Sequence, residues 1–136
     1  MSALTEVRDT REIAAGSIRY TREFTVASGS TVYAGAITAV NSSGKAIPAT
    51  SQGAITVVGR AENTATAGET VKTRSGMFLY NPVSSGAIAV TDLNKTCYVA
   101  DDQTVTLTSG SSAVIAGVVR DVTAGGIVIE IGNGPR

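Results

Sequence analysis

The chain has 136 residues, which is enough for one domain with a hydrophobic core of its own. Its 11 Lys and Arg residues balance its 11 Asp and Glu residues, so the composition gives no indication of a surface that binds nucleic acid. With no histidine and one cysteine, the sequence excludes a Ser–His–Asp triad, an internal disulfide and a zinc cluster of Cys and His ligands.

The apolar composition favours an all-β fold. Val and Ile together number 26 against four Leu, and these β-branched side chains fit a pleated sheet better than a helix. Turn signals recur at the spacing of about 8 to 12 residues that is typical of small β-sandwiches and barrels. The sequence therefore predicts one small all-β domain.

The first 16 residues differ from the rest of the chain. They offer no sustained apolar face and carry a cluster of charges, Glu6, Arg8, Asp9, Arg11 and Glu12. Such a segment cannot bury a face of its own, so we predict that residues 1–16 form an arm that becomes ordered on a partner. A solvated, frayed terminus is the alternative. Residues 17–136 are predicted to form the β domain.

No part of the sequence resembles a targeting or membrane-spanning segment. The charged start lacks the apolar region of a secretory signal. The longest apolar run, residues 113–119, is too short to cross a bilayer. We therefore expect a protein that is made in the cytoplasm and has no membrane partner.

The first half of the β domain is predicted to contain four strands, residues 17–26, 31–40, 45–49 and 53–61. Alternation with a period of two begins at Ser17, with Arg22 as the exception on an otherwise apolar face. The second strand is apolar on both faces, as in a strand buried on two sides, and Gly35 marks a bulge or a close backbone approach. Pro48 restricts the third strand to a sheet edge, because proline has no N–H to donate.

The second half is predicted to contain six strands, residues 70–74, 76–81, 96–100, 103–107, 113–122 and 127–131. The first two are expected to pair with each other around Ser75 and Gly76. The irregular stretch 82–95 allows one turn of helix, capped by Thr91 and with Asp92 in its first turn.

Alternation within the strands also predicts which side chains face inward. We expect a core formed by Ile18, Tyr20, Phe24, Val32, Ile37, Val57, Val58, Phe78, Val99, Val105, Ile115, Val118, Ile127 and Ile129.

The stretch around Cys97 contains the strongest candidates for catalytic chemistry. Cys97 shares a strand face with Val99, and a thiol needs a positive or basic neighbour to become reactive, for which only Lys95 is at hand. We predict an inert core cysteine. Asp101 and Asp102 are predicted to form the tight turn of a hairpin rather than an acid–base pair or a weak calcium site. We expect no catalytic residue, no metal site and no cofactor.

Three stretches taken together resemble a known family. In order and spacing, residues 31–49, 57–82 and 90–122 are similar to the small head-decoration, or cement, proteins of tailed bacteriophages and prophages. The set "VYAGA", "VGRAENT.TAGE", "GMF" and "YVADDQTV…AGVV.DV" carries the resemblance, which covers nearly everything after about residue 20.

The resemblance implies a structural virion protein without enzymatic activity. It implies a small β-barrel or β-tulip domain that coats the capsid exterior, commonly as a homotrimer, with the major capsid protein as partner and the arm as one contact. Two other classes stay open. One is a β module of the tail or baseplate, and the other is a carbohydrate-binding module for the host surface, against which the 4% aromatic content counts.

Overall fold

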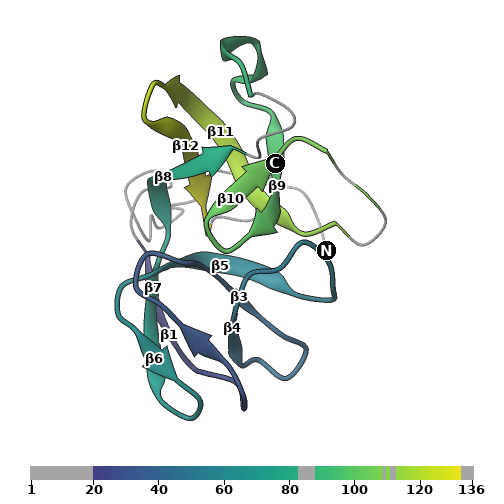
Figure 1. Ribbon diagram of the computed structural model, residues 1–136. Helices are drawn as coiled ribbons and strands as arrows, with labels where there is room; N and C mark the ends of the chain where they lie inside the picture. The colour runs from purple at the N-terminus through teal and green to yellow at the C-terminus, as the bar shows by residue number, and fades with distance from the viewer. Residues whose placement is uncertain (1–19, 83–87, 109, 111–112, 133–136) are drawn as a thin grey trace, which may run out of the picture.

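The computed structural model describes residues 20–82, 88–108, 110 and 113–132. Within these residues it contains twelve strands and one short 3₁₀ helix, so the predicted all-β class is confirmed. The strands form two main sheets, which lie one above the other in Figure 1. The predicted division into an arm, residues 1–16, and a β domain stays a prediction, because the arm lies outside the described residues.

The first sheet has five strands in the order β1-β7-β5-β3-β4. Their bounds are β1 Thr21–Thr25, β3 Ile37–Val40, β4 Ala46–Pro48, β5 Thr56–Ala61 and β7 Thr70–Arg74. All neighbours in this sheet are antiparallel. A separate small ladder joins β2 (Thr31–Val32) to β6 (Ala65–Thr66). The strand that contains Pro48 is the last of the sheet, as predicted for an edge strand.

The first sheet curls so that its two end strands meet at one point. Val26, which follows β1, forms a parallel bridge with Ala46 of β4. The N–H of Ala27 donates to the carbonyl oxygen of Ala46 at 2.9 Å. The end of β1 is thus tied to the opposite side of the sheet.

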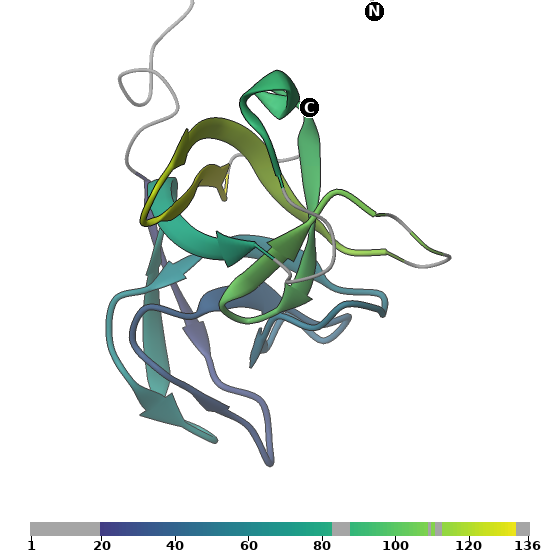
Figure 2. The ribbon, with the colours of Figure 1, turned by 45° about the horizontal axis from the view of Figure 1, so that its top comes forward.

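The second sheet is a closed five-stranded barrel in the order β10-β8-β12-β11-β9. Its strands are β8 Gly76–Pro82, β9 Thr96–Asp101, β10 Thr104–Thr106, β11 Ile115–Thr123 and β12 Gly126–Ile131. The pair β8 and β10 is parallel, and the others are antiparallel. The tilted view of Figure 2 shows the strands of the barrel curving around above the first sheet.

One large core joins the two sheets. It combines side chains of β3 and β5, such as Ile37 and Val57, with barrel residues such as Val99 and Ile129. A second cluster around Val26, Val32 and Val71 packs within the first sheet, separate from the large core. The large core makes the barrel and the first sheet pack as one unit.

Most of the predicted core residues are buried. The prediction is confirmed for Val32, Ile37, Val57, Val58, Val99, Val105, Val118, Ile127 and Ile129. Phe24 and Phe78 are partly buried against the two clusters. Ile18 lies outside the described residues. The prediction was wrong for Tyr20 and Ile115, whose exposed fractions are 49% and 36%.

Residues 31–40 form two strands rather than one. The chain turns between β2 and β3, where the N–H of Ala36 donates to the carbonyl oxygen of Tyr33 at 3.0 Å. Gly35 has a φ of 94°, which a glycine adopts without strain. The turn leaves Tyr33 64% exposed, so this side chain is outside the core.

The strands on either side of Ser75 do not pair with each other, contrary to the prediction. β7 pairs with β1 and β5, whereas β8 pairs with β12 and β10. Only Ser75 separates β7 from β8, and a hairpin needs a loop of about two residues or more. The chain therefore passes at Ser75 from the first sheet to the barrel.

The predicted helical turn exists, but Thr91 does not cap it. The 3₁₀ helix η1 covers Val90–Asp92, and its N-cap is Ala89. Asp92 lies in the first turn as expected, and its Oδ2 accepts a hydrogen bond from the N–H of Ala89 at 2.8 Å.

Candidate functional site

The charged residues predicted to bind a partner precede the described part of the chain. Glu6, Arg8, Asp9, Arg11 and Glu12 lie outside the described residues, so their role stays a prediction. The described part of the chain begins at Tyr20, one residue before β1, and the predicted junction of arm and β domain at Ser17 lies outside it.

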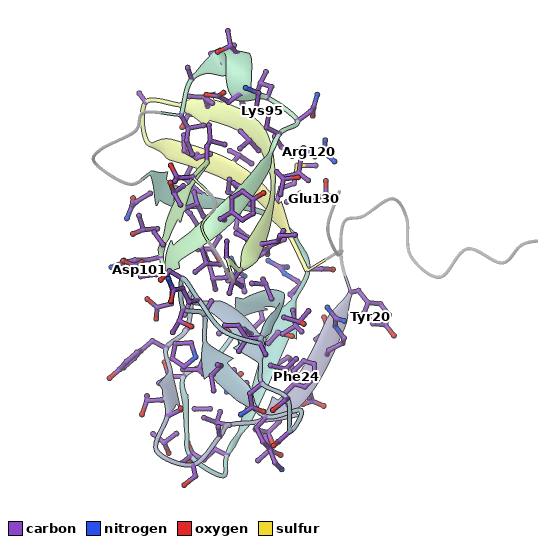
Figure 3. All side chains as sticks on the ribbon, turned by 90° about the vertical axis from the view of Figure 1, so that its right-hand side faces the viewer. Tyr20, Phe24, Lys95, Asp101, Arg120 and Glu130 are labelled. Atoms are coloured by element: carbon purple, nitrogen blue, oxygen red, sulfur yellow. The ribbon has the colours of Figure 1, made fainter. Side chains whose placement is uncertain are left out.

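Tyr20 is fixed to the junction between the two sheets. Its N–H donates to Oγ of Ser75 at 3.0 Å, and the N–H of Ser75 donates to the carbonyl oxygen of Tyr20 at 3.0 Å. Ser75 is buried, whereas the Tyr20 side chain points outward at the edge of the molecule (Figure 3). Tyr20 is therefore anchored where the chain crosses from β7 to β8.

Arg22 connects this anchor to the end of β12. Its Nη2 donates to the carbonyl oxygens of Val58 at 2.8 Å and Gly132 at 3.0 Å. The guanidinium carbon lies 5.9 Å from the centroid of the Tyr20 ring. The alternation identified Arg22 as an exception on an apolar face, but it did not predict that this side chain joins β1 to β5 and to the residue after β12.

Two more arginines lie close to an aromatic ring. The guanidinium carbons of Arg60 and Arg74 lie 4.2 and 5.4 Å from the centroid of the Phe78 ring. Glu62 forms ion pairs with both arginines, and its Oε1 lies 3.3 Å from Nε of Arg74. Cation–π contacts of this kind stabilise partly desolvated arginines. This cluster joins β5 and β7 of the first sheet to β8 of the barrel.

Several apolar side chains are exposed on the barrel and its loops. Met77 and Leu79 alternate with buried residues along β8 and are 54% and 55% exposed. Leu79, Tyr33 and Asp102 are among the residues that line one open hollow. Large exposed apolar groups that gather in one place are typical of protein contact surfaces.

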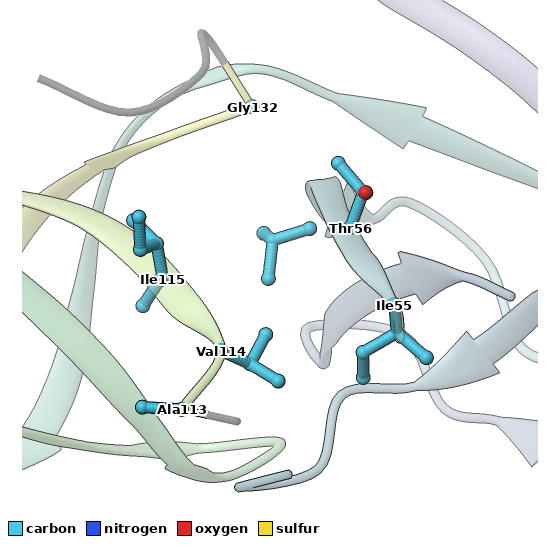
Figure 4. A pocket seen from close by; sticks show the side chains of 8 residues that line it. Ile55, Thr56, Ala113, Val114, Ile115 and Gly132 are labelled. Atoms are coloured by element: carbon cyan, nitrogen blue, oxygen red, sulfur yellow. The ribbon is translucent and has the colours of Figure 1, made fainter. Parts of the chain in front are cut away.

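A second hollow lies between β5 and β11. It has a volume of about 240 Å³ and is lined by Ile55, Thr56, Val57, residues 113–116 and Gly132. Figure 4 shows aliphatic side chains on both of its sides. Since none of its lining residues is ionisable, this hollow can accommodate an apolar group but offers no acid or base.

The structure places Cys97 in the core, as predicted. It is fully buried on β9, and burial raises the pKa of its thiol to about 12. At neutral pH the side chain is therefore a thiol and not the reactive thiolate. Its surroundings explain why no nucleophile forms here.

The predicted hairpin joins β9 to β10, but its two turn residues are Asp102 and Gln103, whereas Asp101 ends β9 and pairs with Thr104. Oδ1 of Asp101 accepts a hydrogen bond from the N–H of Gln103 at 2.9 Å. The carbonyl oxygen of Asp102 accepts one from the N–H of Ile37 at 2.8 Å, which docks the turn on β3. Burial, followed by the charge of Asp101, raises the pKa of Asp102. Asp102 is thus part of the contact between the barrel and the first sheet, whereas the Asp101 side chain stabilises the turn itself.

One buried ion pair was not predicted from the sequence. Glu130 is 4% exposed, and its Oε1 accepts a hydrogen bond from Nε of Arg120 at 2.8 Å. Nη1 of Arg120 also donates to Oδ1 of Asn94 at 2.7 Å. The signal was a single acidic residue within an aliphatic strand, but its partner lies on another strand and could not be identified from spacing.

Comparisons of the chain with protein-family models, curated proteins and solved structures found no match. In the described part of the chain, no three His, Cys, Asp or Glu side chains lie close enough together to hold a metal ion. The helix present among these residues is too short to cross a membrane.

Proposed function

We propose that the protein is a non-enzymatic structural protein of a bacteriophage virion that binds the outer surface of the capsid and stabilises it as a homotrimer. Its partner is the major capsid protein. The observation that carries the proposal is the ordered resemblance of residues 31–49, 57–82 and 90–122 to head-decoration proteins. The all-β body that these residues form is the kind of domain that the resemblance implies.

The architecture supports a role as a rigid body attached to a lattice. One core joins the barrel to the first sheet, and Arg22 ties the first strand to the end of the last one. Many copies on a shell bind with avidity, so each copy needs only modest affinity. A compact domain that does not rearrange loses little conformational entropy when it binds.

The anchored position of Tyr20 supports a role for the preceding segment. Tyr20, the first described residue, is hydrogen-bonded to Ser75 at an outer edge of the molecule. The mixed charges of the preceding segment suit a capsid surface of mixed charge. Exposed charges are screened over about 8 Å at physiological ionic strength, so this contact weakens as salt is added.

The test uses expanded capsids that lack the protein. The full chain, a chain without residues 2–16, and a chain in which a Gly-Ser linker of equal length replaces residues 2–16 are each added at low and high salt. Cryo-electron microscopy gives the position and occupancy on the shell, and heating gives the stability of the shell. We expect the full chain to occupy three-fold positions and to raise the disruption temperature, and both variants to show lower occupancy.

The two controls separate the arm's sequence from its length. If the linker variant decorates capsids as well as the full chain, the charged residues are not the contact. If the full chain does not bind capsids, or is found on the tail or baseplate of the parent particle, the proposed function is wrong.

A further inference from the structure

The open hollow that Tyr33, Leu79 and Asp102 help to line is formed by three segments far apart in the sequence. It has a volume of about 420 Å³ and is lined by residues 33–36, 79–81, 102 and 103. These belong to the turn before β3, to β8, and to the turn between β9 and β10. The neighbouring Asp101 lies at the level where the barrel meets the first sheet in Figure 3.

Hydrogen bonds hold the three segments of this hollow together. The hydroxyl group of Tyr80 donates to the carbonyl oxygen of Gly35 at 3.3 Å. The N–H of Asn81 donates to the carbonyl oxygen of Gln103 at 3.1 Å, and the first residue of β3 donates to the carbonyl oxygen of Asp102 at 2.8 Å. The walls are therefore formed before any ligand arrives, so a ligand does not bear the entropic cost of ordering them.

Asp102 is half-buried beside this hollow and carries a charge that no cation neutralises. The described residues that line the hollow include no Lys or Arg, and none of the ion pairs within the described part of the chain includes Asp102. Burial, followed by the charge of Asp101, raises the pKa of Asp102, so the folded chain disfavours the ionised carboxylate. A cation that came to lie beside this carboxylate would stabilise it.

The other lining residues suit a cation that is carried on an aliphatic chain. Tyr33 is 64% exposed, and a tyrosine ring attracts an ammonium or guanidinium group. Leu79 is 55% exposed and offers an apolar surface to the stem of a long side chain. Asn81 and Gln103 each have an amide oxygen that accepts hydrogen bonds. An anionic ligand would be repelled by Asp102, and a neutral ligand would leave its charge without compensation.

We propose that this hollow binds a lysine or arginine side chain that another protein presents. The cationic group lies beside the carboxylate of Asp102, the aliphatic stem packs against Leu79, and the ring of Tyr33 contacts the cation. This role accounts for a carboxylate that is partly buried without a partner in its own chain, since binding sites retain groups that are unfavourable for folding alone.

The proposal is tested in solution, without capsids, so its failure is distinct from a failure of the proposed function. The probes are the Nα-acetyl N-methylamides of lysine and arginine, and the matched control is the same derivative of norleucine, which has an aliphatic chain but no charge. Each is titrated into the isotope-labelled full chain, and the amide NMR shifts of the lining residues report binding. We expect saturable shifts with both cationic probes, and affinity for norleucine weaker by about tenfold or more.

Two variants that remove the same charge separate the hollow from the surface around it. Asp102→Asn keeps the backbone carbonyl oxygen that accepts from Ile37. Asp101→Asn is the matched control, because Asp101 is exposed and the variant keeps an oxygen that can accept from Gln103. We expect Asp102→Asn to weaken binding of the lysine probe by about tenfold or more and Asp101→Asn by about twofold or less. Tyr33→Leu should weaken it by about threefold.

Four results would overturn the proposal. The first is the absence of shifts at the lining residues with either cationic probe. The second is equal weakening by Asp102→Asn and Asp101→Asn, which would indicate diffuse attraction to the surface. The third is binding of norleucine as tight as that of lysine, which would indicate an apolar site. The fourth is a set of shifts at the same residues when the protein alone is diluted, which would make a second copy of this chain the occupant.

Discussion

Nη2 of Arg22 donates a hydrogen bond to the carbonyl oxygen of Gly132 at 3.0 Å, although 110 positions separate the two residues in the chain. The same atom donates to the carbonyl oxygen of Val58 on β5. One side chain therefore holds the first strand, a central strand and the end of the last strand together. The Tyr20 anchor lies within the same contact network.

We expect Arg22→Met to lower the free energy of unfolding by about 2 kcal/mol. The change keeps most of the aliphatic stem but removes hydrogen bonds from a charged donor, and it leaves two carbonyl groups without that partner. Urea unfolding followed by circular dichroism measures the effect. Lys72→Met, which removes an exposed cation from β7, is the control and should change stability by about 0.5 kcal/mol or less. Equal urea midpoints for the two variants would contradict this role of Arg22.

Gly117→Ala should destabilise the barrel severely. A Cβ atom at residue 117 would lie 1.9 Å from the carbonyl oxygen of Glu130 and 3.2 Å from Cγ2 of Ile129. The two strands β11 and β12 would have to separate, at a cost of about 3 kcal/mol or more. Thermal unfolding measures this loss. Gly110→Ala is the matched control, because no atom lies within 4 Å of its added Cβ. A Gly117→Ala protein as stable as Gly110→Ala would show that β11 and β12 are less closely packed than described.

The buried thiol of Cys97 should make the protein sensitive to alkali. Burial raises its pKa from 9.0 to about 12 in the folded state, so above pH 9 the unfolded chain loses this proton first. Stability is then fully present below pH 9 and is lost as the pH rises toward 12. Between pH 8 and 10 we expect wild type to lose about 1.4 kcal/mol more than Cys97→Ala.

Denaturant unfolding of both proteins at each pH measures this difference. Tyr80, whose pKa burial also raises, is present in both and cancels from the comparison. A thiol reagent should label folded wild type slowly at pH 8 and unfolded wild type quickly. Fast labelling of the folded protein would contradict the burial of Cys97.

Ionisation of Asp102 should lower the stability of the folded protein, whereas ionisation of a salt-bridged carboxylate raises it. Its pKa is raised, mainly by burial and further by Asp101. As the pH rises above the usual value of 3.8, the unfolded chain gives up this proton before the folded one, so stability falls. Asp102→Asn removes this loss and keeps the carbonyl oxygen that accepts from Ile37. We expect the variant to gain stability relative to wild type between pH 3 and 6, measured by thermal unfolding. A difference in melting temperature between Asp102→Asn and wild type that is the same at pH 3 and pH 6 would contradict this prediction.

The class of the fold and most of the core could be predicted from the sequence. Alternation is a local property of a strand, and one face of each strand must be buried wherever a sheet covers a core. Ile127 and Ile129 were therefore assigned correctly without knowledge of their partners. The hairpin at Asp101 and the burial of Cys97 also depend on neighbours a few positions away.

Only the tertiary structure determines which strand faces are buried and which strand edges pair. In the predicted strand 17–26, Tyr20 was expected to face inward and Arg22 to be an exception, but Arg22 is half-buried and Tyr20 is exposed. The reason is that the carbonyl groups of Val58 and Gly132 converge at this point and accept hydrogen bonds from Arg22. Their convergence depends on strands far apart in the chain. Ser75 and the pairing of Arg120 with Glu130 follow the same rule, because the partner of a polar group is set by the fold and not by spacing.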